Sequence, residues 1–167
     1  NNIIGEENRG WYAAMTTLSF ERSNIEGPAM LIRILEDFIA YDKRLRRHGE
    51  SPLDNPIVRH PNTNLRLEIE TMRMLSYRVG WMQSQGLAPN AEASMSKLYA
   101  SEMNKRRQEL LVSIMGAQAL GWEGDGFSRE ETGHTRAWLR TKANSIEGGT
   151  TEVQLNIIAK RVLGLPD

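Results

Sequence analysis

The chain has 167 residues, of which 21 are Lys or Arg and 21 are Asp or Glu, and it contains no cysteine. The balanced charge argues against nucleic acid or an anionic membrane as a partner, because both require a basic excess. Without cysteine the chain forms no disulfide, thiolate metal site or cysteine nucleophile.

The length predicts a single domain. No apolar run approaches the roughly 18 residues of a membrane-spanning helix, so no membrane insertion is expected. The absence of cysteine is compatible with a reducing compartment, and we expect a cytoplasmic protein. The sequence begins without methionine and without a basic-then-apolar signal sequence, so we expect it to be a piece of a longer protein.

Helical periodicity begins near residue 8 and extends to about residue 47. Gly27-Pro28 interrupts it, and we expect a kink or a break there because proline removes a backbone donor. Gly49 ends the segment after several basic side chains, as helix C-termini favour. Apolar residues after the proline recur at three- and four-residue spacing: Leu31, Ile34, Leu35, Phe38 and Ile39.

Two further long helices are predicted over residues 62–85 and 91–120. A proline- and asparagine-rich connection over 50–64 precedes them, and a turn over 86–90 separates them. The residues expected to face the core are Leu65, Ile69, Met72, Leu75, Val79 and Met82 in the first, and Met95, Leu98, Met103, Leu110, Ile114 and Met115 in the second. The methionines, Met74 included, are interpreted as core packing rather than as a cofactor pocket.

The last part of the chain contains a glycine-rich loop over 121–133 and a short polar segment over 131–145. A final helix is predicted over 151–163, ended by Gly164 and Pro166. Long helices joined by short connections predict an all-α fold, an up-and-down four-helix bundle with additional short helices.

The junction before the final helix carries Gly148 and Gly149, followed by Thr150. Thr151 and Gln154 have capping-box spacing, which predicts a helix start within a residue or two of Thr150. Glycines ahead of a helix N-terminus let a ligand approach the backbone closely, so the junction suits an anion or a developing oxyanion. An ordinary loop-to-helix junction has the same sequence features.

Three other groups of side chains each have two interpretations. Glu131 and His134 have the Glu-x-x-His spacing of di-iron bundles, but those sites need two such pairs, so no metal site is predicted. Glu21, beside the aromatic Phe20, is either a general base with a raised pKa or an exposed glutamate that Arg22 keeps ionised. Basic side chains near residue 45 either grip phosphates or form a solvated helix end; they are Lys43, Arg44, Arg46 and Arg47.

Three runs of residues, in their order and spacing, carry a resemblance that covers essentially the whole chain. They are Gly5-Glu6-Glu7-Asn8-Arg9-Gly10-Trp11, Gln118-Ala119-Leu120-Gly121, and Gly148-Gly149-Thr150-Thr151-Glu152-Val153-Gln154 continuing into residues 156–166. With them the chain resembles the C-terminal helical domain of the acyl-CoA dehydrogenase family. The resemblance implies that residues 1–167 are a single helical domain, the C-terminal fragment of a longer enzyme with an N-terminal helical domain and a middle β domain.

The resemblance also implies a reaction and its partners. FAD would lie between the β domain and this domain, with part of the dinucleotide held by a neighbouring subunit of a homo- or hetero-oligomeric dimer or tetramer. A glutamate would remove the α-proton of an acyl-CoA thioester while a hydride leaves the β-carbon for the flavin. The product would be a trans-2-enoyl-CoA, and the electrons would pass to electron-transfer flavoprotein. The isolated 167 residues are expected to be inactive.

The implied base lies on the first helix. Many relatives carry it directly before a Gly-Thr pair, where this chain has Gly148, and Glu147 stands one residue earlier with its side chain expected to point elsewhere. A branch resembling isovaleryl- and long-chain-type enzymes has its base in a segment like Leu18-Ser19-Phe20-Glu21-Arg22. The resemblance therefore implies Glu21 as the base. The implied substrate contacts are Ser19, Phe20, Arg22, Glu147 and Gly148, with Arg22 near the coenzyme A moiety.

The implied flavin contacts are Arg44, Arg46, Gln118, Gly121, Thr150 and Glu152. Three positions depart from the family pattern. Leu45 and His48 stand where the family has an arginine and a phenylalanine, and Trp122 stands where it has a second glycine. These departures support a second hypothesis, a degenerate, non-catalytic subunit kept for the assembly of a hetero-oligomer.

Overall fold

The computed structural model describes residues 3–21, 26–46 and 49–166, with the side chains of all of these except 18–21, 26–29, 31, 34, 35 and 42. These residues form helices joined by loops and contain no β-strand, which confirms the all-α fold. The α-helices are α1 (Gly10–Glu21), α2 (Glu26–Arg44), α3 (Pro56–Ser84), α4 (Asn90–Met115), α5 (Arg129–Thr141) and α6 (Thr151–Ile157). Short 3-10 segments lie at Pro52–Asp54, Gly116–Leu120 and Lys142–Ser145, and a π-helical turn at Ile158–Val162 follows α6.

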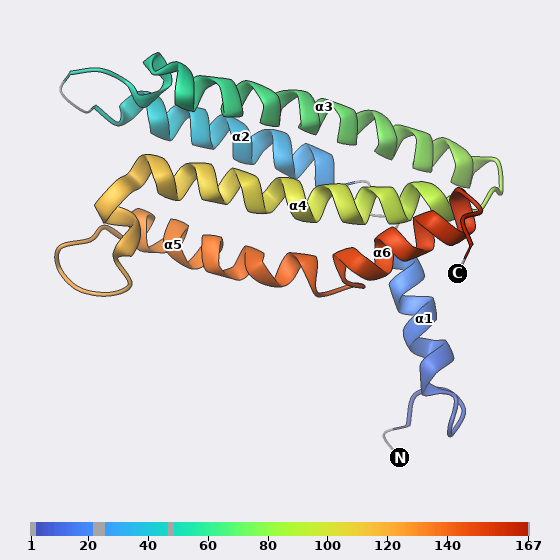
Figure 1. The fold of residues 1–167 in the computed structure, drawn as a ribbon. Coiled ribbons are helices and arrows are strands. Elements are labelled where there is room, and N and C mark those ends of the chain that lie inside the picture. The colour runs from blue at the N-terminus through green and yellow to red at the C-terminus, as the bar shows by residue number, and fades with distance from the viewer. Residues whose placement is uncertain (1–2, 22–25, 47–48, 167) are drawn as a thin grey trace.

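Figure 1 shows α2, α3, α4 and α5 lying side by side as a bundle. Consecutive helices run in opposite directions because short connections join them. The chain continues from α5 into α6, which also packs on α4, while α1 projects away from the bundle. None of the described helices is long and apolar enough to cross a bilayer.

The core lies between α2, α3 and α4, and its composition largely confirms the predicted stripes. Its buried members are Phe38, Leu65, Ile69, Met72, Met103, Leu111, Ile114, Met115 and Ala119. Two predicted core methionines are wrong, because Met74 and Met95 are exposed. Met74 lies two positions beyond Met72, which turns it roughly 200° around the helix. At the start of α4, the small side chains of Ala93 and Ser94 take the buried side in place of Met95.

Helix α3 begins earlier than the proline-rich sequence predicted. Asn55 is its N-cap, and its Oδ1 accepts a hydrogen bond from the Ile57 N–H at 2.9 Å. Pro56 occupies the first helical position, where its missing N–H has no intrahelical partner to lose. Pro61 lies within the helix, so residues 56–64 of the segment expected to be a connection are helical.

Helix α5 is the fourth helix of the bundle, although the sequence predicted only a short polar segment there. A capping box starts it: Ser128 Oγ accepts from the Glu131 N–H at 3.1 Å, and Glu131 Oε2 accepts from the Ser128 N–H at 2.7 Å. The face that packs on α4 buries threonines, Thr132 and Thr135, rather than large apolar residues. Thr135 donates to the Ala119 carbonyl at 3.1 Å, so the buried hydroxyl is satisfied.

Candidate functional site

The turn between α5 and α6 brings together several of the predicted site residues. The N–H groups of Ile146 and Glu147 both donate to the Ala143 carbonyl at 2.9 Å. Gly148 and Gly149 then adopt φ values of +66° and +97°, in the region that favours glycine. The turn thus reverses the chain into α6 within a few residues.

Thr150 is the N-cap of α6, and its Oγ1 accepts from the Val153 N–H at 3.2 Å. The predicted helix start is confirmed, but the predicted capping pair of Thr151 and Gln154 is wrong. Thr151 Oγ1 instead donates to Glu102 of α4 at 2.8 Å. A tertiary contact thus takes the hydroxyl that the sequence spacing assigned to the cap.

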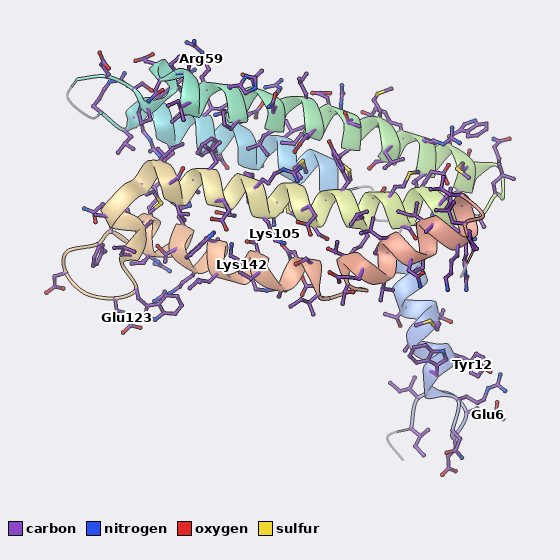
Figure 2. The ribbon with its side chains drawn as sticks, viewed as in Figure 1. Glu6, Tyr12, Arg59, Lys105, Glu123 and Lys142 are labelled. Atoms are coloured by element: carbon purple, nitrogen blue, oxygen red, sulfur yellow. The ribbon has the colours of Figure 1, made fainter. Side chains whose placement is uncertain are left out.

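Polar side chains of α4 hold this turn in place. Lys97 Nζ donates to the Asn144 carbonyl at 2.9 Å, and Asn104 Nδ2 donates to Asn144 Oδ1 at 2.8 Å. Lys105 points from α4 toward the turn and donates to Ser145 Oγ at 3.2 Å (Figure 2). Burial lowers the pKa of Lys97, while the nearby carboxylates of Glu147 and Glu102 oppose that shift. The turn is therefore anchored at successive residues to one helix.

Glu147 is held by ionic and hydrogen-bonding partners. Arg140 donates to its two carboxylate oxygens at 2.7 and 3.2 Å, and Asn144 Nδ2 donates at 2.6 Å. Arg140 and then Asn144 lower the pKa of this carboxyl group. The prediction that this side chain points elsewhere agrees with an ion pair back to α5. A carboxylate held in this way is a weak proton acceptor.

A cleft of about 220 Å³ opens beside the start of α6. Its lining is Glu102, Lys105, Ser145, Ile146, Thr150, Thr151 and Glu152. Lys105 is 3.1 Å from Glu102, and the hydrogen bond from Thr151 is the main cause of the lowered pKa of Glu102. The cleft therefore offers an ammonium group, hydroxyls and two carboxylates to a polar ligand.

Two predicted flavin contacts, Thr150 and Glu152, line this cleft. The sequence did not predict that Glu102 and Lys105 of α4 line the cleft. The i,i+3 pair of Glu102 and Lys105 was the available signal, but such pairs are common on exposed helix faces and do not by themselves indicate a site.

The other predicted flavin contacts lie at the opposite end of α5. Arg44, at the end of α2, forms an ion pair at 3.0 Å with Glu130 in the first turn of α5, whereas Glu147 pairs with Arg140 in its last turn. Arg46 and Gln118 are exposed. The predicted flavin contacts therefore form two groups, which lie at the two ends of α5.

Gly121 is buried under an aromatic ring. A Cβ on Gly121 would lie 2.7 Å from Cε1 of Phe127, so only glycine fits without displacing that ring. The next residue, Trp122, has the Arg136 guanidinium 4.7 Å from its ring centre, and Arg136 also donates to its carbonyl at 3.0 Å. These contacts fix the loop that follows α4 against α5.

Leu45 is half-buried and packs against the core, at the position where the resemblance implies an arginine. His48 and Arg22 lie outside the described residues. The backbones of Ser19, Phe20 and Glu21 form the end of α1, but their side chains lie outside the described ones.

Glu131 and His134, which have the Glu-x-x-His spacing, each make a separate structural contact. The carboxylate of Glu131 caps α5, and the His134 ring packs edge-on against Tyr41 with 5.3 Å between ring centres. Among the side chains that the structure describes, no three His, Asp or Glu are grouped so that they could hold a metal ion.

Comparison with known proteins identifies the family of this bundle. The model of the acyl-CoA dehydrogenase C-terminal domain matches residues 8–163. The chain belongs to the acyl-CoA dehydrogenase family. It is 30% identical over 166 residues to the acyl-CoA dehydrogenase IpdE1 of Mycobacterium tuberculosis, covering 98% of this chain and 40% of that protein.

Other acyl-CoA dehydrogenase relatives have similar coverage. The short-chain specific acyl-CoA dehydrogenase of Megasphaera elsdenii is 28% identical over 97% of this chain and 41% of its own length. The chain therefore spans about two fifths of the length of these relatives.

Solved structures show the same arrangement of helices. The Tcur3481-Tcur3483 steroid ACAD superposes with a TM-score of 0.76 at 27% identity, over 97% of this chain and 41% of that one. The FAD complex of PigA gives a TM-score of 0.76 at 27% identity, over 97% and 40% of the two chains.

Proposed function

We propose that these 167 residues are the C-terminal domain of a longer, FAD-dependent acyl-CoA dehydrogenase in which Glu21 is the base. The proposed reaction removes the α-proton of an acyl-CoA thioester as a hydride leaves the β-carbon, giving a trans-2-enoyl-CoA. Electron-transfer flavoprotein is the proposed electron acceptor. Family membership supports the reaction class, and the α5–α6 turn supports the choice of base.

The observation that carries this proposal is the ion pair between Glu147 and Arg140. Gly148 has no side chain, and the one carboxylate beside it is held by Arg140 and Asn144 with a lowered pKa. The turn therefore lacks a competent proton acceptor of its own. A base must come from another element, and Glu21 is the last residue of α1.

The space around Gly148 is compatible with a base that lies on another helix. A Cβ on Gly148 would meet only Cε of Lys97, at the ordinary contact distance of 3.7 Å. The space around Gly148 therefore admits a larger side chain, at the cost of backbone strain at a φ of +66°. This supports the interpretation that a carboxylate at residue 21 and a glycine at residue 148 compensate for each other.

The residues proposed to contact a flavin dinucleotide lie in two separate places. The cleft supplies Lys105 Nζ and the hydroxyls of Ser145 and Thr150 as polar contacts, with Glu152 at its edge. Arg44, Arg46, Gln118 and Gly121 lie at the far end of α5. Because the two groups are a helix apart, we propose that the second group contacts a dinucleotide bound mainly by a neighbouring subunit. When bound, FAD supplies the hydride acceptor.

The base assignment is tested in the longer enzyme with Glu21→Gln. We expect turnover to fall roughly 10²–10⁴-fold while flavin absorbance stays intact, because that is the typical contribution of a general base. Glu147→Gln is the matched control and should stay within about tenfold of the parent, since it does not transfer the proton. Full activity in Glu21→Gln would remove the assignment.

A second variant shows whether Glu21→Gln loses activity because the base is missing or because the fold is disturbed. Glu21→Gln combined with Gly148→Glu returns a carboxylate to the turn, and we expect it to recover activity over Glu21→Gln alone. The 167 residues alone should be inactive with every acyl-CoA, because they lack the β domain that would cover the flavin. Turnover by this isolated chain would contradict that expectation.

The alternative is a degenerate subunit of a hetero-oligomer. It is favoured by Leu45, which packs into the core in place of a flavin-binding arginine, and by the ion pair that occupies Arg44. The ratio of flavin to chain, measured after co-expression with homologous subunits, distinguishes the two. One flavin per chain excludes degeneracy, and flavin on the partner chains alone supports it.

An activity assay distinguishes the two possible carriers of the acyl thioester, coenzyme A and a carrier protein. One relative, 29% identical over 96% of this chain, is the L-prolyl-[peptidyl-carrier protein] dehydrogenase of Pseudomonas fluorescens. We propose acyl-CoA because the other relatives named above are acyl-CoA dehydrogenases. Activity with carrier-protein thioesters and none with acyl-CoA would overturn this choice.

A further inference from the structure

Helix α4 carries a charged residue in the middle of its buried apolar face. Met103, Arg107 and Leu111 follow one another at four-residue spacing, and each is at most 7% exposed. The Nε and Nη2 atoms of Arg107 both donate to Asn104 Oδ1, at 3.2 and 2.8 Å, and no carboxylate among the described residues pairs with this cation. Burying a charge without a counter-charge lowers stability, which indicates that Arg107 has a role other than stabilising the core.

A series of hydrogen bonds extends from Arg107 to the glycine turn. Asn104 Nδ2 donates to Asn144 Oδ1 at 2.8 Å, and Asn144 Nδ2 donates to Glu147 Oε1 at 2.6 Å. Glu147 directly precedes Gly148 in the sequence. We call Arg107, Asn104, Asn144 and Glu147, joined in this order, the amide chain. The amide chain connects the core of the bundle to the turn that carries several of the predicted site residues.

The charges at the two ends of the amide chain fix the orientation of both amide groups. A guanidinium group only donates and a carboxylate only accepts. Asn104 must therefore present its oxygen to Arg107, and Asn144 must present its nitrogen to Glu147. Hydrogen bonds joined in this way polarise one another, so a change at one end alters the bond at the other.

Glu147 depends on this support because its ion pair is exposed. The side chains of Arg140 and Glu147 are 62% and 47% exposed, and an ion pair as exposed as this holds two side chains together only weakly. Asn144 is partly buried, and its carbonyl also accepts from Lys97 Nζ at 2.9 Å. Of these two partners of Glu147, Asn144 is therefore the one held firmly in position.

The turn beyond Glu147 presents backbone donors whose direction depends on this support. The N–H groups of Gly148 and Gly149 donate to no carbonyl or side chain in the part of the chain that the structure describes. They are therefore available to a ligand. Donors that are held in place before a reaction stabilise developing charge better than donors that must first be ordered.

We propose that Arg107 is a positioning residue for the glycine turn, which it holds in place through the two asparagines of the amide chain. This inference rests on the proposed function only in treating the turn as part of the active site. It also explains why a buried cation is present where an apolar side chain would be more stable. Arg107 does not touch the turn itself and acts on it through Asn104 and Asn144.

Asn104→Asp interrupts the amide chain without removing a polar group. The new carboxylate pairs directly with Arg107, so we expect the free energy of unfolding of this chain to stay the same or increase. A carboxylate cannot donate to Asn144, whose amide group then turns toward it and no longer donates to Glu147. Arg140 and then Asn144 lower the pKa of Glu147. We therefore expect that pKa to rise, as measured by carbon-13 NMR titration.

Asn64→Asp is the matched control for this titration. It makes the same substitution at an exposed position of α3, so the pKa of Glu147 should stay at that of the parent chain. Arg107→Met removes the first donor of the amide chain and should raise the pKa of Glu147, whereas Arg107→Lys keeps a charged donor and should change it less. A titration that Asn104→Asp leaves unchanged, or that Asn64→Asp moves equally, overturns the inference.

The same variants test the positioning role in the longer enzyme. Asn104→Asp and Arg107→Met should each lower kcat about tenfold and leave KM within about threefold, because misplaced donors reduce the rate more than substrate binding. Arg107→Lys should recover most of the lost kcat, and flavin absorbance should not change. If Arg107 only filled the core, Arg107→Met would keep the parent kcat, and that result overturns the inference.

These outcomes are distinguishable from a failure of the proposed function. If Glu21→Gln keeps full activity while Asn104→Asp and Arg107→Met lose it, the proposed base is wrong and the positioning role is supported. If Asn104→Asp and Arg107→Met keep the parent kcat while Glu21→Gln loses it, the positioning role is overturned and the base assignment stands.

Discussion

The side-chain nitrogen of Gln154 lies 2.6 Å from the point that a Cβ on Gly149 would occupy. The same nitrogen donates to the Gly148 carbonyl at 3.2 Å, and the Gln154 side chain is almost completely buried. Gly149 therefore has two reasons to be glycine, a φ of +97° and the space taken by Gln154. This pair therefore joins the turn to the first part of α6.

Gly149→Ala tests both reasons together. We expect a loss of about 3 kcal/mol in the free energy of unfolding, from left-handed backbone strain and displacement of the buried Gln154 hydrogen bond. Gly86→Ala is the matched control, with a φ of +70° and no atom within 4 Å of the added Cβ. It should lose only about 1 kcal/mol. Urea unfolding measures both, and equal losses would show that Gln154 moves freely.

The cap of α6 is tested by two substitutions at Thr150. Thr150→Val removes the oxygen that accepts from the Val153 N–H, and we expect a loss of about 1 kcal/mol in unfolding free energy. Thr150→Ser keeps that oxygen and should stay close to the parent. In the longer enzyme, Thr150→Val should also retain less flavin than Thr150→Ser. Equal stability of the two variants would contradict the capping role.

His134 predicts a dependence of stability on pH. Burial lowers the pKa of His134 below its ordinary value of 6.5; Glu130 opposes this shift and Arg107 adds to it. The unfolded chain therefore binds more protons near that pH. Stability is full above about pH 7 and falls as the pH decreases through 6.5 toward the lower folded pKa. Urea midpoints at pH 7.5 and 5.5 should show this decrease.

His134→Phe is the control for that titration. It keeps an aromatic ring against Tyr41 and removes the titrating group, so most of the decrease between pH 7.5 and 5.5 should disappear. Carboxylates with lowered pKa, such as Glu102 and Glu131, lose their contribution only below about 4.5, outside this range. An unchanged decrease in His134→Phe would assign the effect to another group.

Arg107 is a buried cation with few partners. Its guanidinium donates to Asn104 Oδ1 at 2.8 and 3.2 Å, no carboxylate among the described residues pairs with it, and burial lowers its pKa to about 10. Arg107→Met should raise the free energy of unfolding by about 1 kcal/mol, because the desolvation of the charge is removed. Asn104→Ala should lower it, since Arg107 and Asn144 both lose a partner. Calorimetry of the two variants checks the signs.

Apolar periodicity predicted α3 and α4 because each buries one continuous face. Leu65, Ile69 and Met72 lie where three- and four-residue spacing places them. The same signal failed for α5, which buries the hydroxyls of Thr132 and Thr135 rather than large apolar groups. Its capping box at Ser128 and Glu131 was present in the sequence, and would have located the helix start where hydrophobicity did not.

The chemistry of the candidate site was partly readable from the sequence. The positive φ values at Gly148 and Gly149 follow from glycine's freedom, and a helix start at Thr150 follows from the residues around it. The role of Glu147 was not readable, because its partner Arg140 lies on the preceding helix and the contact depends on how the turn folds back. The α4 lining of the cleft was missed for the same reason.

The amino-acid sequence by itself determined the family, the helical class and the position of the glycine turn, because these depend on local propensity and on the order of short motifs. Only the tertiary structure decided that Glu147 is held in an ion pair, that Leu45 packs into the core, and that the predicted flavin contacts lie at opposite ends of α5. Each of these depends on distances between residues far apart in the chain. Such distances are set when helices pack their faces together, and residue spacing within one helix does not contain them.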